Sequence, residues 1–378
     1  MNKTIDANIE AHFGHIDDPR RTYLNDHSLI NIITIALCAV IAGAEGWTDI
    51  EMFGQQKKEW LSRFLNLENG IPSHDTFGRV FARIDPEQFR QSFLSWVQAV
   101  FKATSGQVVA VDGKVLRRSH DKGLGKHAIR MISAWATDNH LVLGQRKVGQ
   151  RSSEITAIPQ LLKLLDISGC IVTIDAIGTQ TKIAAQIIDQ DADYLLPVKE
   201  NQATLLEDIA LFFKLAAQDN FAKVGHTQHR TVDNNHGRME IRECWAIDGS
   251  ENIAFLRGAA DWPKLQTIVM MRSERRWKQK TSVETMYFIT SLANDARQIL
   301  AAKRAHWGIE NSLHWILDVA FREDDSRVRQ GNADQNLAIL RHMALNLLKQ
   351  EKTAKGGIKA KRLLAGWNED YLVKVLSG

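Results

Sequence analysis

Residues Ala301–Arg329 form the stretch AAKRAHWGIENSLHWILDVAFREDDSRVR, which predicts a helix with polar groups gathered on one face. His306, Glu310 and His314 recur at intervals of four residues, so they share one side of an α-helix. Asp318 extends that side by a further turn. Apolar residues surround these groups, namely Trp307, Ile309, Leu313, Ile316, Leu317 and Val319. An acid in such an apolar setting is typical of a metal-dependent site, and an ordinary surface glutamate is the alternative for Glu310.

Two further acids each follow a short apolar run that predicts a β-strand. Asp112 comes directly after Gln107–Val111. Asp175 comes after Cys170–Ile174, and a predicted helix over Thr179–Asp189 follows it. Two acids at strand ends and a third on a later helix can hold two divalent ions about 3.5–4 Å apart. Oxygen ligands favour Mg²⁺ or Mn²⁺ over Zn²⁺, although either aspartate alone is better explained as a turn former or helix cap.

Length and composition are those of an ordinary folded protein without a strong overall charge. The chain has 378 residues, enough for one large domain or two, with 44% hydrophobic residues and a formal net charge of +4. Basic residues cluster at Arg117-Arg118, at Ser273–Lys280 and at Lys349–Arg362. Each cluster indicates either a nucleic-acid contact or a solvated face.

Cysteine usage and hydropathy indicate a cytoplasmic protein with no membrane partner. Cys38, Cys170 and Cys244 are widely separated and form neither a disulfide framework nor a zinc motif, which is typical of a reducing compartment. The apolar segment Leu29–Ala44 is short for a membrane span and follows a charged leader unlike a signal peptide. We therefore expect this segment to form a buried helix.

Residues 1–98 predict an all-helical N-terminal domain. Helical segments are expected at Leu29–Gly43, Ile50–Leu65, Asp75–Ile84 and Pro86–Ala103, divided by glycine- and proline-containing breaks. Ser73 is expected to cap the third segment, which carries Arg79 and Arg83 on one face. Such a helix is typical of DNA recognition or of plain helical packing.

From Gly106 the pattern changes to strands, so residues 99–378 predict an α/β domain. Strands are expected at Val108–Val111, Arg130–Thr137, Leu141–Lys147 and Tyr194–Val198, with a hairpin turn at Asp138-Asn139 and a helix at Ile155–Leu165. This order predicts a mixed sheet with helices on its faces. Further strands at Arg238–Ile247, Thr267–Arg272 and Met286–Ser291 predict a β-rich insertion over about residues 200–292.

Three motifs resemble those of insertion-sequence transposases with a DDE catalytic triad: VDGK at Val111–Lys114, TIDAIGTQ at Thr173–Gln180 and HWGIENSLHWILDVAFRED at His306–Asp324. The resemblance extends over nearly the whole chain and is strongest to the H-repeat-associated transposases of enteric bacteria. It includes DDPRR, IAGAEGWTDI and GIPSHDTFGRVF near the start. It implies a ribonuclease-H-like mixed sheet flanked by helices, with the β-rich insertion before the third acid and the all-helical domain in front.

The resemblance implies that Asp112, Asp175 and Glu310 are the catalytic acids and the ligands of two Mg²⁺ or Mn²⁺ ions. The implied reaction is cleavage of double-stranded element ends and strand transfer into target DNA, by a homodimer. Relatives carry a tyrosine-arginine-glutamate-lysine signature around the third acid, but here His306 stands in place of the arginine and Leu317 in place of the lysine. DNA contacts are expected from Lys114, Arg117, Arg118, Arg275, Arg276, Lys303, His306 and His314.

Two other functions fit the same residues. A catalytically silent DNA-binding remnant of a mobile element would keep phosphate contacts through its basic residues without using the acids. A metal-dependent nuclease would use the acids to cut DNA but would not join strands. Metal-dependent cleavage separates the remnant from the two enzymes, and a joined product separates the transposase from the nuclease.

Overall fold

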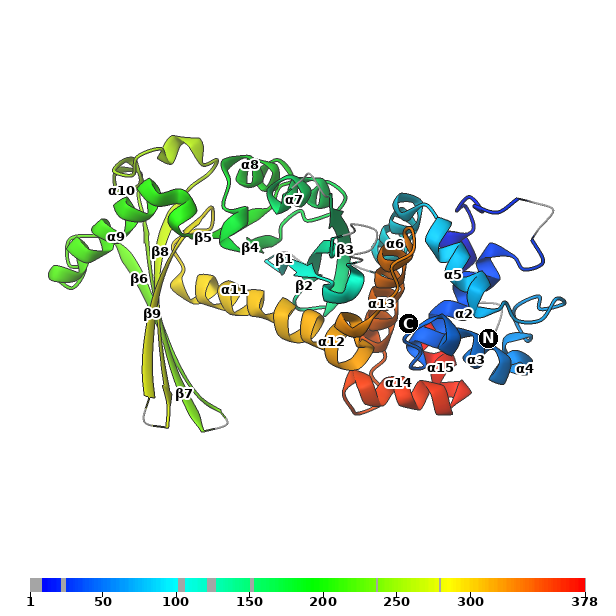
Figure 1. The fold of residues 1–378 in the computed structure, drawn as a ribbon. Helices are drawn as coiled ribbons and strands as arrows, with labels where there is room; N and C mark the ends of the chain where they lie inside the picture. Colours follow the sequence, from blue (N-terminus) through cyan, green and yellow to red (C-terminus); the bar gives the residue numbers. More distant parts are fainter. Residues whose placement is uncertain are drawn as a thin grey trace.

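The structure, a computed structural model, describes residues 9–21, 25–100, 106–120, 127–149, 153–235, 237–278 and 280–377. These residues form a mixed α/β protein with one sheet: a helical bundle packs at one end of the sheet, and a long β-ribbon of the same sheet projects at the other (Figure 1). The mixed sheet with flanking helices confirms the predicted α/β class. None of the helices in the described ranges is long and apolar enough to cross a membrane.

The sheet contains nine described strands in the order β3-β2-β1-β4-β5-β9-β8-β7-β6. The strands are β1 (Val108–Val115), β2 (Arg130–Ala136), β3 (Leu141–Val148), β4 (Ile171–Ile174), β5 (Asp193–Val198), β6 (His226–Asn235), β7 (Arg238–Asp248), β8 (Thr267–Trp277) and β9 (Lys280–Thr290). β1, β4 and β5 are parallel, and the other neighbouring pairs are antiparallel. Parallel neighbours need crossover connections, which α7 (Glu154–Leu162) and α8 (Thr181–Asp189) help to supply.

One sequence prediction about the strands needs correction. β1 does not end before Asp112 but continues to Val115, because Asp112 and the three residues after it pair with β2. The strands of the predicted β-rich insertion extend the same sheet, since β9 pairs with β5. The insertion also contains two helices, α9 (Ala203–Gln218) and α10 (Ser250–Ala254). Beyond β5, strands β6–β9 form the twisted ribbon that projects from the molecule (Figure 1).

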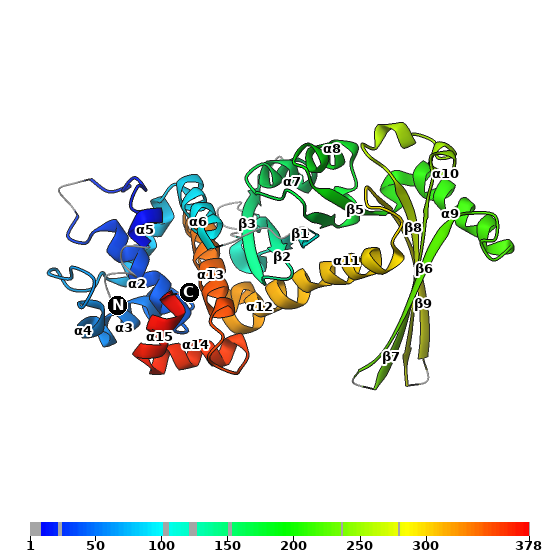
Figure 2. The ribbon, with the colours of Figure 1, turned by 180° about the vertical axis from the view of Figure 1, so that it is seen from behind.

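The helical bundle combines both ends of the chain (Figure 2). Its helices are α2 (Leu29–Ile41), α3 (Trp47–Gln56), α4 (Lys58–Leu61), α5 (His74–Arg83), α6 (Pro86–Val100), α13 (Ala333–Gln350), α14 (Ile358–Trp367) and α15 (Glu369–Ser377). α2 is almost entirely buried, as predicted, and packs against α13, α14 and α15. Ser73 caps α5 by accepting a hydrogen bond from the Thr76 N–H, which confirms that prediction. Residues 101–103 of the predicted fourth helix lie outside the described residues.

The basic run Lys349–Arg362 is solvated only in part: Lys352, Lys355 and Lys359 are exposed, whereas its last two residues, Lys361 and Arg362, are buried. Arg362 donates hydrogen bonds to the carbonyl groups of Val40 and Ala44 at the end of α2. Lys361 forms an ion pair with Glu351. These cations satisfy backbone carbonyls at a helix end, so they hold the bundle together.

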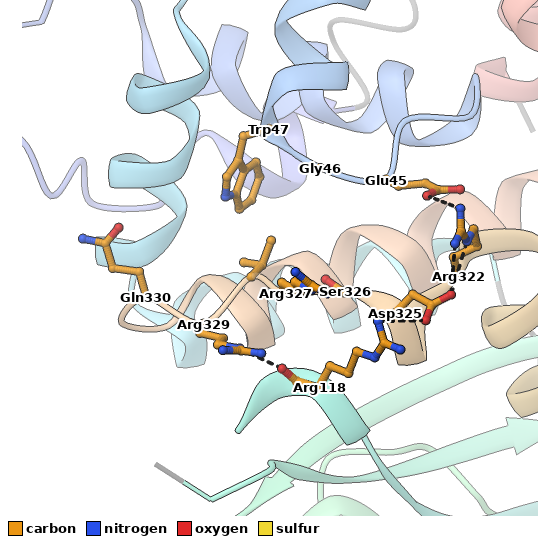
Figure 3. A pocket seen from close by; sticks show the side chains of 11 residues that line it. Glu45, Gly46, Trp47, Arg118, Arg322, Asp325, Ser326, Arg327, Arg329 and Gln330 are labelled. Carbon is orange, nitrogen blue, oxygen red and sulfur yellow. Dashed lines mark hydrogen bonds and ion pairs between the residues drawn. The ribbon is translucent and has the colours of Figure 1, made fainter. Parts of the chain in front are cut away.

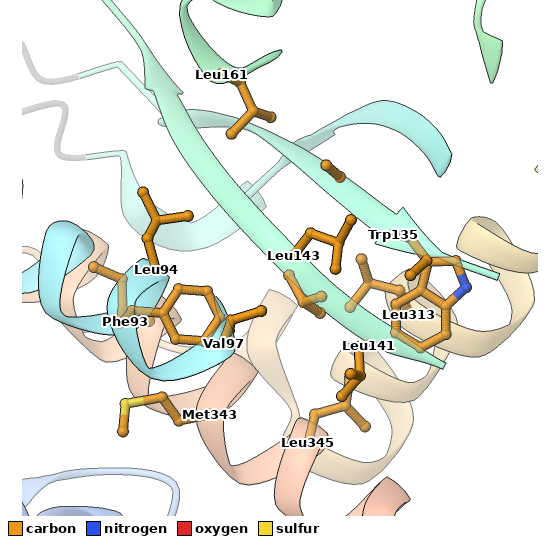
Figure 4. Close-up of a cluster of buried hydrophobic side chains, with 14 of the residues drawn as sticks. Phe93, Leu94, Val97, Trp135, Leu141, Leu143, Leu161, Leu313, Met343 and Leu345 are labelled. Carbon is orange, nitrogen blue, oxygen red and sulfur yellow. The ribbon is translucent and has the colours of Figure 1, made fainter. Parts of the chain in front are cut away.

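A buried apolar cluster joins the bundle to the sheet and also fixes the helix that carries Glu310 (Figure 4). Phe93 of α6 and Leu345 of α13 pack toward β2 and β3, where Trp135 and Leu143 are buried. Leu313 enters the same cluster with no exposed surface. Because Leu313 lies between Glu310 and His314 in the chain, this packing anchors both polar residues against the sheet.

Candidate active site

Asp112, Asp175 and Glu310 line one cavity of about 450 Å³. β1 and β4 deliver the two aspartates side by side, because Val111 is the register partner of Ile174 and each aspartate is the next residue. Parallel strands present such consecutive positions at the same edge of a sheet. The structure therefore brings the three predicted acids to one place from two strands and a helix.

Glu310 begins a π-helical turn in a long helical segment. α11 (Ala296–Ile309) leads into the π turn Glu310–His314, and α12 (Trp315–Phe321) follows it. The sequence predicts an uninterrupted α-helix here, and the π turn is a departure from it. Single π turns inside α-helices are frequent at functional sites, since the extra residue re-aims side chains. Here the turn leaves Glu310 exposed and buries His314.

His314 lies between two of the acids. Its Nδ1 is 2.8 Å from Oε2 of Glu310 and 3.5 Å from Oδ2 of Asp112. One ligand atom from each of these three residues lies within 4.8 Å of the others. The His314 side chain is only 7% exposed, so it does not face DNA as expected from the resemblance but sits inside the acidic cluster. Two carboxylates and an imidazole nitrogen are donors that fit a divalent cation.

The acids repel one another. Burial, with smaller contributions from the charges of Asp175 and Glu310, raises the pKa of Asp112 to about 6, although His314 lowers it. One oxygen of Asp112 also accepts a hydrogen bond from the Gly113 N–H at 2.8 Å. A partly buried carboxylate that other carboxylates disfavour is stabilised by a bound cation. The charge distribution therefore fits the metal site that the sequence predicts.

His306 and Lys303 line the same cavity, on the α11 side. His306 Nδ1 lies 3.0 Å from the Thr173 hydroxyl, and burial lowers the pKa of His306. Its imidazole is thus mainly neutral near pH 7 and cannot replace the charge of an arginine. Burial lowers the pKa of Lys303 to about 8, which leaves that amine mostly protonated at pH 7. Lys303 is consequently the cation that the cavity offers on this helix.

Lys114 does not fit its expected role in binding DNA. Its side chain is 10% exposed, and its ammonium group forms ion pairs with Asp318 and, at 2.9 Å, with Glu323. A phosphate could be contacted only after these buried pairs were broken. Lys114 therefore joins β1 to the segment that follows Glu310.

The four arginines expected to contact DNA are exposed but lie on two separate surfaces. Arg117 pairs with Asp324 at 3.3 Å, and Arg118 pairs with Asp325 at 3.4 Å, both just beyond the end of β1. Arg275 and Arg276 lie far along the ribbon on β8, beside Glu240 and Glu274. Exposed pairs of this kind contribute little to stability, so phosphate can compete for these arginines.

Two residues that line the cavity, Lys199 and Glu284, are not among the site residues predicted from the sequence. Lys199 directly follows β5, the third parallel strand, so the strand-end rule that selects Asp175 could have found it. Glu284 lies on β9, and its position depends on how the insertion pairs with β5. No local sequence pattern predicts the pairing of β9 with β5.

The chain is similar to known proteins over most of its length. Residues 103–347 match the family described as Transposase DDE domain, and residues 10–97 match the family described as DDE_Tnp_1-associated. "Putative transposase YncI" of Escherichia coli O157:H7 is 41% identical over 96% of this chain and 92% of its own length. "H repeat-associated putative transposase YhhI" of Escherichia coli K12 is 38% identical over 98% of each chain.

Among solved structures, a piggyBac transposase synaptic complex with hairpin DNA has a TM-score of 0.43 at 12% identity, covering 98% of this chain and 79% of that one. The matches to the two families and to full-length relatives rest on most of the sequence. The chain therefore belongs to the DDE transposase family, with H repeat-associated transposases among its relatives.

Proposed function

We propose that this chain is a working transposase that cuts the ends of its element and joins them to target DNA. The observation that carries the proposal is the convergence of Asp112, Asp175 and Glu310 on one cavity. Because two acids come from adjacent parallel strands and one from a packed helix, their spacing does not depend on a mobile loop. A preorganised set of acids is what metal-dependent phosphoryl transfer requires.

The proposal includes a ribonuclease-H-like catalytic domain over residues 99–378, whose last three helices, α13–α15, pack in the helical bundle. Strand order β3-β2-β1-β4-β5, with one acid on β1 and one after β4, supports it. Residues 1–98 would form the accompanying helical domain and help to bind the DNA ends. Arg20, Arg79 and Arg83 line a cavity of about 620 Å³ there, which supports that role. Two chains would act together as a homodimer, one on each end.

Two Mg²⁺ or Mn²⁺ ions, when bound by Asp112, Asp175 and Glu310, would supply a more acidic water or 3′-hydroxyl and neutralise charge on the scissile phosphate. The side chains of this protein perform the positioning. His314 holds the Glu310 carboxylate at 2.8 Å, and Leu313 packs the turn against the sheet. Lys303 and Lys199 bring positive charge to the cavity, where a phosphate oxygen can be contacted.

The direct test is cleavage of a labelled duplex that contains the DNA bordering the gene, with Mg²⁺ or Mn²⁺. Asp112→Asn, Asp175→Asn and Glu310→Gln should each reduce nicking by about 10²-fold or more while leaving the fold intact. Asp324→Asn is a matched control, because Asp324 pairs with Arg117 outside the cavity, and it should retain activity. Nicking by the Asp112→Asn variant at the unaltered rate would refute the mechanism.

The same reactions distinguish the two alternatives. Tight DNA binding without metal-dependent nicking would identify a silent remnant. Nicked product that is never joined to a target duplex would identify a nuclease. The acidic cluster favours the two enzymes over the remnant, since mutual repulsion of carboxylates lowers stability unless a cation is bound.

A further inference from the structure

A second cavity, outside the acidic one, is lined by arginines and lies where the helical bundle meets the sheet (Figure 3). It has a volume of about 780 Å³. Its wall residues are Trp47 at the start of α3, Arg118 just after β1, and Arg322, Arg327 and Arg329 in the segment that follows α12. We call this cavity the arginine groove.

The arginine groove carries an excess of positive charge. Among the described residues that line it are four arginines and two acids, Glu45 and Asp325. Arg322 lies near both acids, at 3.6 Å from Glu45 and 3.2 Å from Asp325, and Arg118 lies 3.4 Å from Asp325. Arg327 is exposed and forms no ion pair with any residue in the described ranges. The described carboxylates thus leave the charge of Arg327 unbalanced, and an anion is the ligand that completes the charge of the groove.

The groove is also ordered without a ligand. Arg329 donates a hydrogen bond from Nε to the carbonyl oxygen of Arg118 at 2.9 Å (Figure 3). This bond connects the segment after α12 to the turn after β1. The Trp47 ring stacks on Phe81 with centroids 5.1 Å apart, so the opposite wall is fixed by the bundle. Guanidinium groups held in place by such contacts lose little freedom when they bind a phosphate.

Two parts of the groove follow elements that carry catalytic acids. Arg118 comes after β1, which carries Asp112, and Arg322 comes after the helical segment that carries Glu310. β1 runs from Asp112 to Val115, about 10 Å at 3.3 Å per residue, before the turn that holds Arg118. The helical segment from Glu310 to Phe321 rises about 16 Å at 1.5 Å per residue before Arg322. The groove therefore lies on the order of 15 Å from the acids. A duplex whose axis runs from the acids to the groove covers that distance in about four to five base pairs, at 3.4 Å of axial rise for each pair.

We infer that the arginine groove binds the phosphodiester backbone of the substrate duplex about four to five base pairs from the scissile bond. This inference rests on the proposed function, because it takes the acids as the place of cleavage. The groove contacts phosphate and no base edge, so it adds affinity and fixes the position of the DNA without reading sequence. It places the helical bundle and the catalytic sheet on the same stretch of DNA.

Binding of a 30-base-pair duplex with the gene-bordering sequence, titrated with salt, tests the contact. Arg327→Ala should weaken binding roughly tenfold and reduce the slope of log affinity against log salt by about one, as loss of one phosphate contact requires. Arg327→Lys should keep the slope, because an ammonium group also binds phosphate. Lys223→Ala removes one charge at the opposite end of the molecule, where Lys223 is 86% exposed, and should change neither quantity.

Position is tested by placing one neutral methylphosphonate at a time along the duplex. A replacement about four to five base pairs from the cut should weaken binding by the unaltered protein and not by Arg327→Ala. An equal penalty in both proteins, or an unchanged salt slope in the variant, would overturn the inference. Asp112-dependent nicking is measured in the same samples. If nicking is intact but Arg327→Ala changes neither affinity nor salt slope, the role of the groove in DNA binding is refuted and the proposed function stands. Binding without nicking refutes the proposed function instead.

Discussion

The ammonium nitrogen of Lys114 lies 2.9 Å from a carboxylate oxygen of Glu323, and this buried ion pair joins residues 209 positions apart. Lys114 stands two residues after Asp112 on β1, and Glu323 follows the helix that carries Glu310. Asp318 completes the contact from α12. The pair therefore fixes the two elements whose relative position sets the spacing of the acids.

Removal of Lys114 should destabilise the fold strongly. Lys114→Met leaves Glu323 buried, with Arg341 at 3.8 Å as its remaining ion-pair partner among the described residues. Loss of one partner from a buried pair costs about 3–5 kcal/mol of unfolding free energy, which denaturant unfolding can measure. Arg117→Met, at an exposed position, should change stability by about 0.5 kcal/mol or less.

A double variant separates lost charge balance from lost packing. Lys114→Met combined with Glu323→Gln leaves no unpaired buried charge at this position, so it should recover part of the lost stability. If the double variant were no more stable than Lys114→Met, packing around the lysine stem would account for the effect.

His342 should make the fold sensitive to acid. It is buried on α13, and burial lowers its pKa from 6.5 to about 4. The folded state thus favours the neutral ring, so the contribution of His342 is fully present above pH 6.5 and is lost as the pH falls toward 4. His342→Gln should remove about 3 kcal/mol of this pH dependence of unfolding free energy. His127→Gln, at an exposed position, should leave it unchanged.

Asp112 should lower the stability of the fold near neutral pH, whereas neutral His342 contributes to it. Its folded pKa of about 6 lies above the ordinary value of 3.8, so its charged form is disfavoured in the fold. The resulting penalty is present above pH 6 and disappears as the pH falls toward 3.8. In metal-free buffer, Asp112→Asn should therefore raise stability at pH 7 by on the order of 1–3 kcal/mol and have little effect near pH 4.

Metal binding gives an independent check on the same residue. Mg²⁺ should raise the unfolding midpoint of the unaltered protein at pH 7.5 more than at pH 5.5, because protons compete for the carboxylate. The gain should be smaller in Asp112→Asn. An identical Mg²⁺ effect in both proteins would exclude Asp112 as a metal ligand.

Local sequence signals account for much of the fold and for the acids. Ser73 before α5, the apolar run before Asp175, and the four-residue spacing around Glu310 are each visible in a few consecutive residues. They predict elements because caps, strand burial and helical periodicity depend on neighbours in the chain.

What the sequence does not predict depends on contacts between distant residues. The pairing of β9 with β5 makes the insertion part of one sheet, and no run of residues encodes that partner. Lys114 looks like a surface cation until Glu323 is brought to it. The π turn at Glu310 arises where Leu313 is packed against Trp135 and its neighbours, which a periodic pattern does not reveal.

His306 should matter less for cleavage than the three acids do. It hydrogen-bonds Thr173, two residues before Asp175, and its lowered pKa leaves it mainly neutral. A neutral ring can position the strand end but cannot supply charge to the phosphate. His306→Ala should therefore slow metal-dependent nicking by about tenfold, within the range for groups that orient metal ligands.

The hydrogen bond itself is tested through its partner. Thr173→Val keeps the shape of the buried side chain but removes the hydroxyl, so it should slow nicking about as much as His306→Ala. Thr173→Ser keeps the hydroxyl and should be near the unaltered rate. If the effects of His306→Ala and Thr173→Val multiplied in the double variant, the two residues would act separately. A double variant no slower than either single one is the expected result, because both changes remove the same hydrogen bond.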